Sequence, residues 1–152
     1  MKRFTRTIQQ LFPAQQTVSA HCDGPCGVYD PASARIAAEA ALSMTKKILA
    51  LDPKDHSHAN LNTMTRYIKI KEEQAHLAKT DLLVLWTDYF KPPHLEQYPD
   101  LHDTFWQAAK LCSAVKVEVS LEKAEALMAA IQKIHKIFWA TKGREVPYYQ
   151  AG

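Results

Sequence analysis

The sequence predicts an all-α protein whose core is an antiparallel four-helix bundle. Residues that favour helices (Ala, Leu, Lys, Glu and Gln) dominate the chain from position 31 to position 142. Four segments in that range repeat apolar residues at helical spacing, and short links join them. Glycine occurs 4 times and proline 8 times in 152 residues, which is atypical of disordered or collagen-like chains. A chain of this length is expected to form one domain.

The first predicted helix starts at Asp30 and Pro31, because aspartate caps helices and proline suits the first helical position. It ends at Asp52 and Pro53, since proline does not continue a helix. Its apolar residues at helical spacing predict the buried side, which comprises Ile36, Ala40, Met44, Ile48 and Leu51.

The second predicted helix is the longest, starting near Ser57 and stopping before the pair Pro92 and Pro93. The mixed charges at Lys69, Lys71, Glu72 and Glu73 indicate a solvated face. Residues 92–98 are expected to form a loop with aromatic anchors. The expected inner side of the helix comprises Leu61, Met64, Ile68, Ala75, Ala78, Leu82, Leu85 and Trp86.

The third and fourth predicted helices span residues 99 to about 115 and residues 120 to about 142. Ser120 can cap the fourth, and Lys142-Gly143 suits its end. Residues 143–152 then form a C-terminal tail. The expected inner face of the third helix is Leu101, Phe105, Ala108, Ala109 and Cys112, and that of the fourth is Leu121, Ala124, Leu127, Met128, Ile131, Ile134 and Phe138.

Charge is distributed unevenly along the chain. Lys2, Arg3 and Arg6 are the only charged residues before His21, and they account for the whole net charge of +3, because 16 basic and 16 acidic residues remain. The folded domain therefore gives no charge-based case for binding nucleic acid. No apolar run approaches the ~20 residues of a membrane-spanning helix, so no membrane association is expected.

Residues 1–20 differ in composition from the rest of the chain and end in the small residues Ser19 and Ala20, which resemble a processing site. The segment lacks the apolar stretch of about 7–15 residues that a secretory signal requires, so the cytoplasm is the expected compartment. Two interpretations stay open on composition alone: a disordered tail, or a propeptide that a dedicated protease removes.

Three cysteines are too few for a disulfide framework. Cys112 lies in a helical pattern and is expected to be a small buried core residue. Cys22 and Cys26 are close in sequence and follow His21, so thiolate sulfur and imidazole nitrogen fall within six residues. Those are ligands for zinc, copper, iron or nickel. The spacing alone also suits a redox disulfide, half of a zinc site or two unrelated thiols.

Cleavage after Ala20 would change the chemistry of this segment, since it would free the α-amine of His21. That amine, the backbone nitrogen and thiolate of Cys22, and the thiolate of Cys26 could then form a planar set of two nitrogens and two sulfurs. The His21 imidazole could approach from the axial direction. Such planar coordination favours Ni(II) or Cu(II) over zinc.

Three segments resemble one known family, the nickel-containing superoxide dismutases. Residues 21–31 are similar to the mature N-terminus of that family, with its pattern H-C-x-x-P-C-G-x-Y. Residues 85–94 are similar to its W-x-D-Y-F-K-P-P-H segment, and residues 137–142 to its I-F-W-x-T-K ending. The resemblance covers nearly everything from His21 to Lys142.

The resemblance implies a propeptide at residues 1–20, a nickel-binding hook at residues 21–30 and a four-helix bundle at residues 31–142. It also implies a homohexamer, a processing protease for the leader, and a Ni(II)/Ni(III) cycle that disproportionates superoxide to dioxygen and hydrogen peroxide. The implied nickel ligands are His21, Cys22 and Cys26, and the implied catalytic residues are His21 and Tyr29.

By the same resemblance, Asp23, Pro25 and Arg66 surround the metal site. The family often places a glutamate early in the first helix to orient the axial imidazole, and the aligned residue here is Ala37. Glu39 lies on a different helix face. Two other functions stay open: a metal-binding or thiol-redox module without turnover, and a purely structural bundle whose cysteine pair is incidental.

Overall fold

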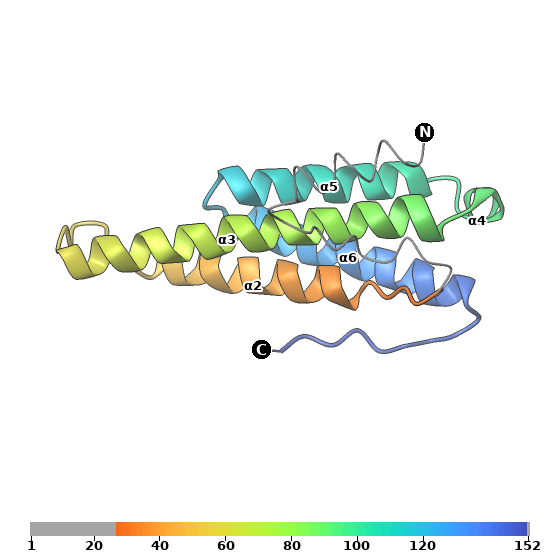
Figure 1. Ribbon diagram of the computed structural model, residues 1–152, viewed down its shortest axis with the longest axis horizontal. Helices are drawn as coiled ribbons and strands as arrows, with labels where there is room; N and C mark the ends of the chain where they lie inside the picture. The colour runs from red at the N-terminus through yellow and green to blue at the C-terminus, as the bar shows by residue number, and fades with distance from the viewer. Residues whose placement is uncertain (1–26, 152) are drawn as a thin grey trace, which may run out of the picture.

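Four long helices form the bundle in the computed structural model, which describes residues 27–151 (Figure 1). They are α2 (Ala32–Leu49), α3 (His58–Val84), α5 (Leu101–Val117) and α6 (Leu121–Thr141). Each packs against the next in the chain, and α6 closes the ring against α2. No strand occurs among the described residues, so the predicted all-α bundle is confirmed. None of the helices in this part of the chain is long and apolar enough to cross a membrane.

Helices α5 and α6 supply most of the bulky core. Their predicted inner faces are largely confirmed, because only Ala109 and Leu121 are partly exposed. Burial of this apolar surface is the main driving force for the bundle, at about 25 cal/mol per Å². The largest buried apolar side chains from these two helices are Leu101, Phe105, Val115, Leu127, Ile131, Ile134 and Phe138.

Helix α2 packs through alanines, and here the sequence-based prediction is wrong by about one position. Ile36 is 58% exposed, and Ala40 and Met44 are only partly buried. Small side chains let α2 approach its neighbours closely, so the contact face runs through alanine methyls and leaves isoleucine outside. The buried residues of this face are Ala34, Ala37, Ala38, Ala41, Thr45 and Ile48.

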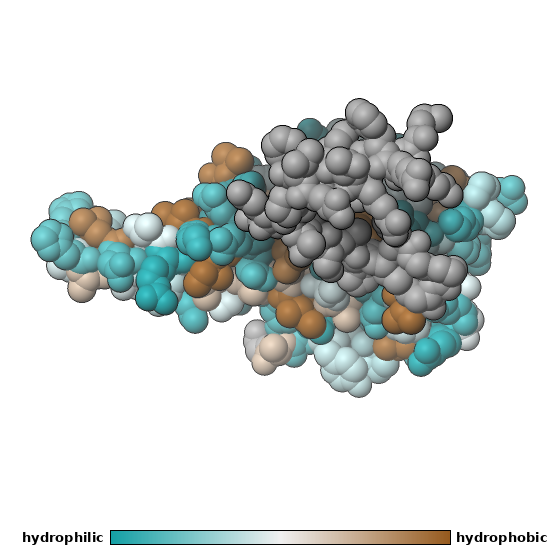
Figure 2. Space-filling model, in the orientation of Figure 1, coloured by the Kyte–Doolittle hydropathy of each residue, from teal (hydrophilic) through white to brown (hydrophobic). Residues whose placement is uncertain are grey.

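The first turns of α3 and the last turns of α2 extend beyond the other helices as an overhang (Figure 1). Leu61 was expected on the inner side, yet it is 49% exposed because it lies on this overhang. Figure 2 shows apolar residues scattered among hydrophilic ones along it. Helix α3 starts near Ser57 as predicted, and Ser57 caps it, because its hydroxyl accepts a hydrogen bond from the backbone N–H of Asn60 at 3.2 Å.

The end of α3 is a π-helical turn, η1 (Leu85–Tyr89), followed by a short helix, α4 (Pro92–Gln97). The loop predicted at residues 92–98 is therefore wrong, because most of this segment is helical. Two prolines fit the first turn of a helix, where backbone N–H groups have no partner inside the helix. The Nδ1 of His94 accepts a hydrogen bond from the backbone N–H of Lys91 at 3.0 Å and completes the cap.

Lys71 corrects the prediction of a solvated charged face on α3, because it is only 1% exposed. Its ammonium donates to three backbone carbonyls at the end of α5: Val115 at 2.5 Å, Lys116 at 2.9 Å and Glu118 at 3.0 Å. The last carbonyls of a helix have no partner within it. The lysine therefore caps the C-terminus of a neighbouring helix.

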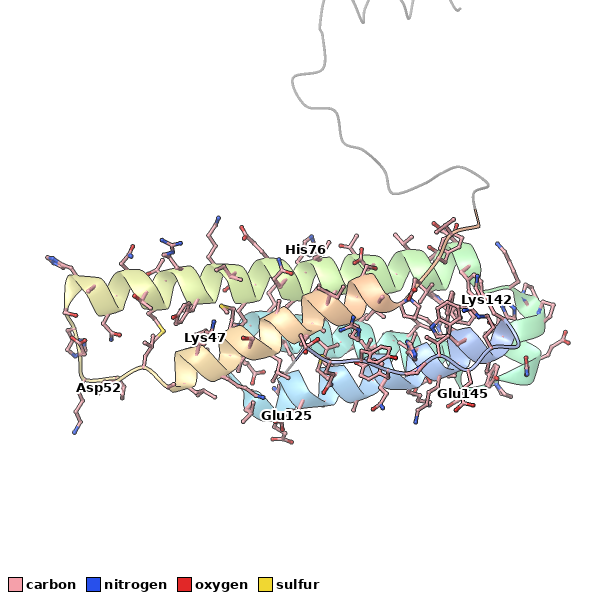
Figure 3. The ribbon with its side chains drawn as sticks, turned by 90° about the horizontal axis from the view of Figure 1, so that it is seen from below. Lys47, Asp52, His76, Glu125, Lys142 and Glu145 are labelled. Atoms are coloured by element: carbon pink, nitrogen blue, oxygen red, sulfur yellow. The ribbon has the colours of Figure 1, made fainter. Side chains whose placement is uncertain are left out.

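Residues 143–151 have no regular structure and run back along the bundle beside α6 (Figure 1). Gly143 has φ of 64°, a left-handed conformation that glycine adopts without a steric penalty, so α6 ends where predicted. Figure 3 shows Lys142 at the same end of the bundle as α4 and Asp52 at the opposite end.

Candidate metal centre

The predicted ligands His21, Cys22 and Cys26, and their neighbours Asp23 and Pro25, lie outside the described residues. Within residues 27–151, no group of three or more His, Cys, Asp or Glu side chains is placed to hold a metal ion. What the structure does show is where the chain leaves the predicted hook and how that point joins the bundle.

The chain enters the bundle through a turn at Gly27 and a cap at Asp30. Gly27 has φ of 66°, and a residue with a Cβ would be strained there. Val28 is 73% exposed, whereas Pro31 is fully buried. The Oδ1 of Asp30 accepts a hydrogen bond from the backbone N–H of Ala32 at 2.8 Å. The segment that follows Cys26 is thus fixed to the first turn of α2 within four residues.

A groove of about 220 Å³ lies beside this entry point. Val28, Tyr29, Asp30 and Ser33 line it on one side, and the end of α3 lines it on the other through Asp81, Val84 and Leu85. The first described residues, 27–30, therefore lie at the end of the bundle where α3 turns into its π-helical segment.

Tyr29 meets a second tyrosine at this end. Its ring centroid is 5.8 Å from that of Tyr89, with the planes tilted by 54°. The Tyr89 hydroxyl shares a hydrogen bond of 2.6 Å with Oγ1 of Thr141, and its ring lies 4.5 Å from Phe138 and 5.6 Å from His94. Tyr89 is thus held from several sides and supports Tyr29.

Sequence analysis missed Tyr89 as a site residue. The signal that could have found it is its place inside the segment 85–94, which resembles the family. Nothing in the spacing of the sequence links position 89 to position 29.

A cation lies over the same aromatic group. The Nζ of Lys142 is 5.2 Å from the ring centroid of Tyr89 and 5.0 Å from that of Phe138. Cation–π contacts of this kind stabilise the lysine by about 0.5–1 kcal/mol at exposed sites. They also keep the positive charge of Lys142 beside Tyr89 and Phe138.

Arg66 is not brought near this end within one chain. It is exposed and lies 15 residues before Asp81 on α3, a separation of roughly 22 Å at the helical rise per residue. Ala37 is buried in the bundle core. Its methyl group cannot form a hydrogen bond with an imidazole.

Glu39, two residues after Ala37, forms an ion pair and a hydrogen bond within residues 27–151. Its carboxylate pairs with Arg35 at 3.0 Å and accepts a hydrogen bond from the backbone N–H of Ala151. The side chain is therefore engaged by α2 itself and by the C-terminal segment.

The third cysteine is a core residue, as predicted. Cys112 is buried and free, and its burial raises the pKa of the thiol to about 12. A thiol with such a pKa stays protonated at neutral pH, so it is neither nucleophile nor metal ligand.

Residues 16–142 of the chain match the sequence model of the family described as nickel-containing superoxide dismutase. Two relatives are named superoxide dismutase [Ni]. The one from Streptomyces seoulensis is 46% identical over 135 residues, which cover 89% of this chain and 98% of the relative. The one from Streptomyces coelicolor is 44% identical over the same lengths.

Solved structures agree with the sequence matches. The native structure of a nickel superoxide dismutase at 1.30 Å is similar with a TM-score of 0.73 and 44% identity, covering 82% of this chain and 100% of that one. A structure described as having nickel ligation of the oxidized state gives the same coverage and TM-score at 45% identity. The chain therefore belongs to the nickel-containing superoxide dismutase family, and nickel is its cofactor.

Proposed function

We propose that this protein disproportionates superoxide at a nickel site formed by residues 21–26, with His21, Cys22 and Cys26 as ligands. The overall reaction consumes two superoxide anions and two protons and yields one dioxygen and one hydrogen peroxide. Bound nickel would supply the Ni(II)/Ni(III) couple that takes an electron from one superoxide and returns it to the next. The observation that carries the proposal is the meeting of Tyr29 and Tyr89 where the chain enters the bundle.

The donor set of the hook fits nickel. The thiolates of Cys22 and Cys26, together with amine and amide nitrogens at His21 and Cys22, would hold the ion, and these sulfur and nitrogen donors suit nickel. Cys112 cannot contribute, because it is buried far along α5 with a raised pKa. This leaves Cys22 and Cys26 as the sulfur donors of the chain.

Around that site, the chain's own residues would bind the anion and supply a proton. Tyr29 carries a phenol O–H that can donate to an anion held near the hook. Tyr89 holds the Tyr29 ring at this end of the bundle, and Lys142 lies over the Tyr89 ring and adds positive charge. This end of the bundle would therefore combine the hydrogen-bond donor Tyr29 with the positive charge of Lys142, which attracts a small anion.

Replacing Tyr29 by phenylalanine is expected to raise KM for superoxide by about 10- to 100-fold, because a hydrogen bond to a charged group contributes about 1.5–3 kcal/mol. Nickel content should stay unchanged, since the phenol is not a ligand. Pulse radiolysis gives KM and kcat separately. Tyr149→Phe is the matched control, because Tyr149 is 68% exposed and lies on the C-terminal segment. An unchanged KM in Tyr29→Phe would remove this tyrosine from anion binding.

The experiment that tests the proposed site compares a chain that begins at His21 with the chain that keeps residues 1–20. With stoichiometric nickel, the first is expected to remove superoxide rapidly and the second is expected to lack activity, since only the first has the free α-amine. Zinc-loaded protein serves as the control. A fully active uncut chain would contradict the ligand set, and bound nickel without turnover would indicate a metal-binding module instead.

Four further expectations stay predictions: removal of residues 1–20 by a protease, assembly into a homohexamer, a cytoplasmic location, and a role for Arg66 near the metal. Since Arg66 lies far from Tyr29 along α3, such a role would require contact between two copies of the chain.

A further inference from the structure

The C-terminal segment, residues 143–151, lies outside the part of the chain that the family match covers, which ends at residue 142. It nevertheless makes specific contacts with the bundle. Where it leaves α6, the Arg144 guanidinium stacks on the ring of Trp139 at 4.8 Å. Further along, the carbonyl of Val146 is 2.8 Å from Nε2 of His135.

Tyr148 is the central anchor of this segment. Its hydroxyl donates to the carbonyl of Met128 on α6 at 3.2 Å, and its ring lies edge-on to His135 at 5.3 Å. Its burial raises the pKa of the phenol. The neighbouring Tyr149 is mostly exposed. One of two adjacent tyrosines therefore fastens the segment, and the other does not.

The segment ends on a different helix from the one it leaves. The backbone N–H of Ala151 donates to the Glu39 carboxylate on α2, which also binds Arg35 one turn earlier. Between its anchors the segment spans a cavity of about 850 Å³ beside α6. It is thus held by a few point contacts, so that loss of one anchor has a large effect.

The first turns of helix α2 bury little apolar surface, so an additional contact would stabilise them. In its first three turns the buried residues are Ala34, Ala37, Ala38 and Ala41, and each buries little apolar area. The bulky Ile36 points away from the core. The first turns of α2 therefore gain less from core packing than α5 or α6 does.

We propose that residues 143–151 act as a strap that pins α2 to α6 within one chain, with Tyr148 as its main anchor. The strap compensates for the alanine face of α2 and steadies the helix that carries the entry from residues 21–30. The inference does not depend on nickel or on the catalytic proposal, because its contacts all lie within residues 35–151.

Hydrogen exchange measured by mass spectrometry on the full chain tests the strap. In Tyr148→Ala, amides of residues 32–42 are expected to exchange about tenfold faster, because local opening of α2 becomes easier. Amides of α5 should keep their protection, and Tyr149→Ala should match the parent protein throughout.

Two outcomes would overturn the proposal. Unchanged exchange in residues 32–42 would show that the segment does not stabilise α2, and equal acceleration in all helices would show a general loss of stability rather than a local strap. A dilution series on the parent protein and on Tyr148→Ala adds a second measurement. If the difference in α2 protection between the two proteins disappears on dilution, the segment docks on another copy and the strap within one chain is wrong.

Discussion

Replacing Cys22 or Cys26 by serine is expected to abolish superoxide turnover and to lower nickel affinity by at least about 100-fold. Changes to groups around a metal ligand already cost about 10–100-fold in affinity, and loss of a ligand itself costs more. A serine hydroxyl stays protonated at neutral pH and donates much less electron density than an anionic thiolate, so it binds nickel weakly and does not make a higher oxidation state reachable. Nickel content by elemental analysis and superoxide decay by pulse radiolysis measure the two effects.

Cys112→Ala is the matched control for these two variants. It also removes a cysteine, but one that is buried in α5 with a thiol pKa of about 12. It should bind nickel fully and keep its activity, with a modest loss of stability from the small cavity. Full nickel binding in Cys22→Ser or Cys26→Ser would contradict the proposed ligand set.

Replacing Lys71 by methionine is expected to lower the free energy of unfolding by about 2–4 kcal/mol, because acceptors at the end of α5 lose their donor. Methionine keeps the length and apolar stem of lysine but cannot donate to the carbonyls of Val115, Lys116 and Glu118. Urea unfolding at a fixed protein concentration measures the difference. Lys69→Met, which removes an exposed ion pair with Glu73, should cost less than about 0.5 kcal/mol.

The pH dependence of this difference has a defined sign. Burial lowers the pKa of Lys71 below its ordinary 10.5, and the nearby charge of Glu72 partly offsets that effect. Between the lowered value and 10.5 the unfolded chain holds more protons than the folded protein. The free energy of unfolding therefore increases as the pH rises through that window. The advantage of the parent protein over Lys71→Met should grow as the pH rises toward 10.5, and a shrinking advantage would contradict the effect of burial.

Where side chains are bulky, the sequence predicted the fold well. The faces of α5 and α6 are marked by leucine, isoleucine and phenylalanine at helical spacing, so only one orientation buries them. The face of α2 could not be chosen in this way. Alanines occur on several sides of it, and whether they or Ile36 face inward depends on how closely the neighbouring helices approach.

Lys71 shows a second reason why the sequence pattern mispredicts burial. It falls on the same helical stripe as Ala75, Ala78 and Leu82, so its spacing indicated burial. Its charge, by contrast, predicts exposure. The carbonyls that stabilise it lie more than 40 residues away in the chain, and no local pattern shows them.

The candidate site was predictable only in its local part. The sequence predicts candidate donors at residues 21–26 and places Tyr29 directly after them, because these residues are contiguous. It does not show that Tyr89 meets Tyr29, or that Lys142 lies over both Tyr89 and Phe138, since three separate segments must fold together first. The anchors of residues 143–151 were missed for the same reason.

The π-helical turn at Leu85–Tyr89 lets α3 pack in the core without fixing the direction of Tyr89, which one continuous α-helix would do. In an α-helix each residue rotates the next by about 100°, so the face that packs in the core dictates every later direction. A π-helical turn contains more residues than an α-helical turn. It therefore changes the direction in which Tyr89, beside Tyr29, points relative to Leu82 in the core. The core of α3 and the direction of its terminal aromatic residue can consequently vary independently, so repacking the bundle need not turn Tyr89 away from the entry of the hook.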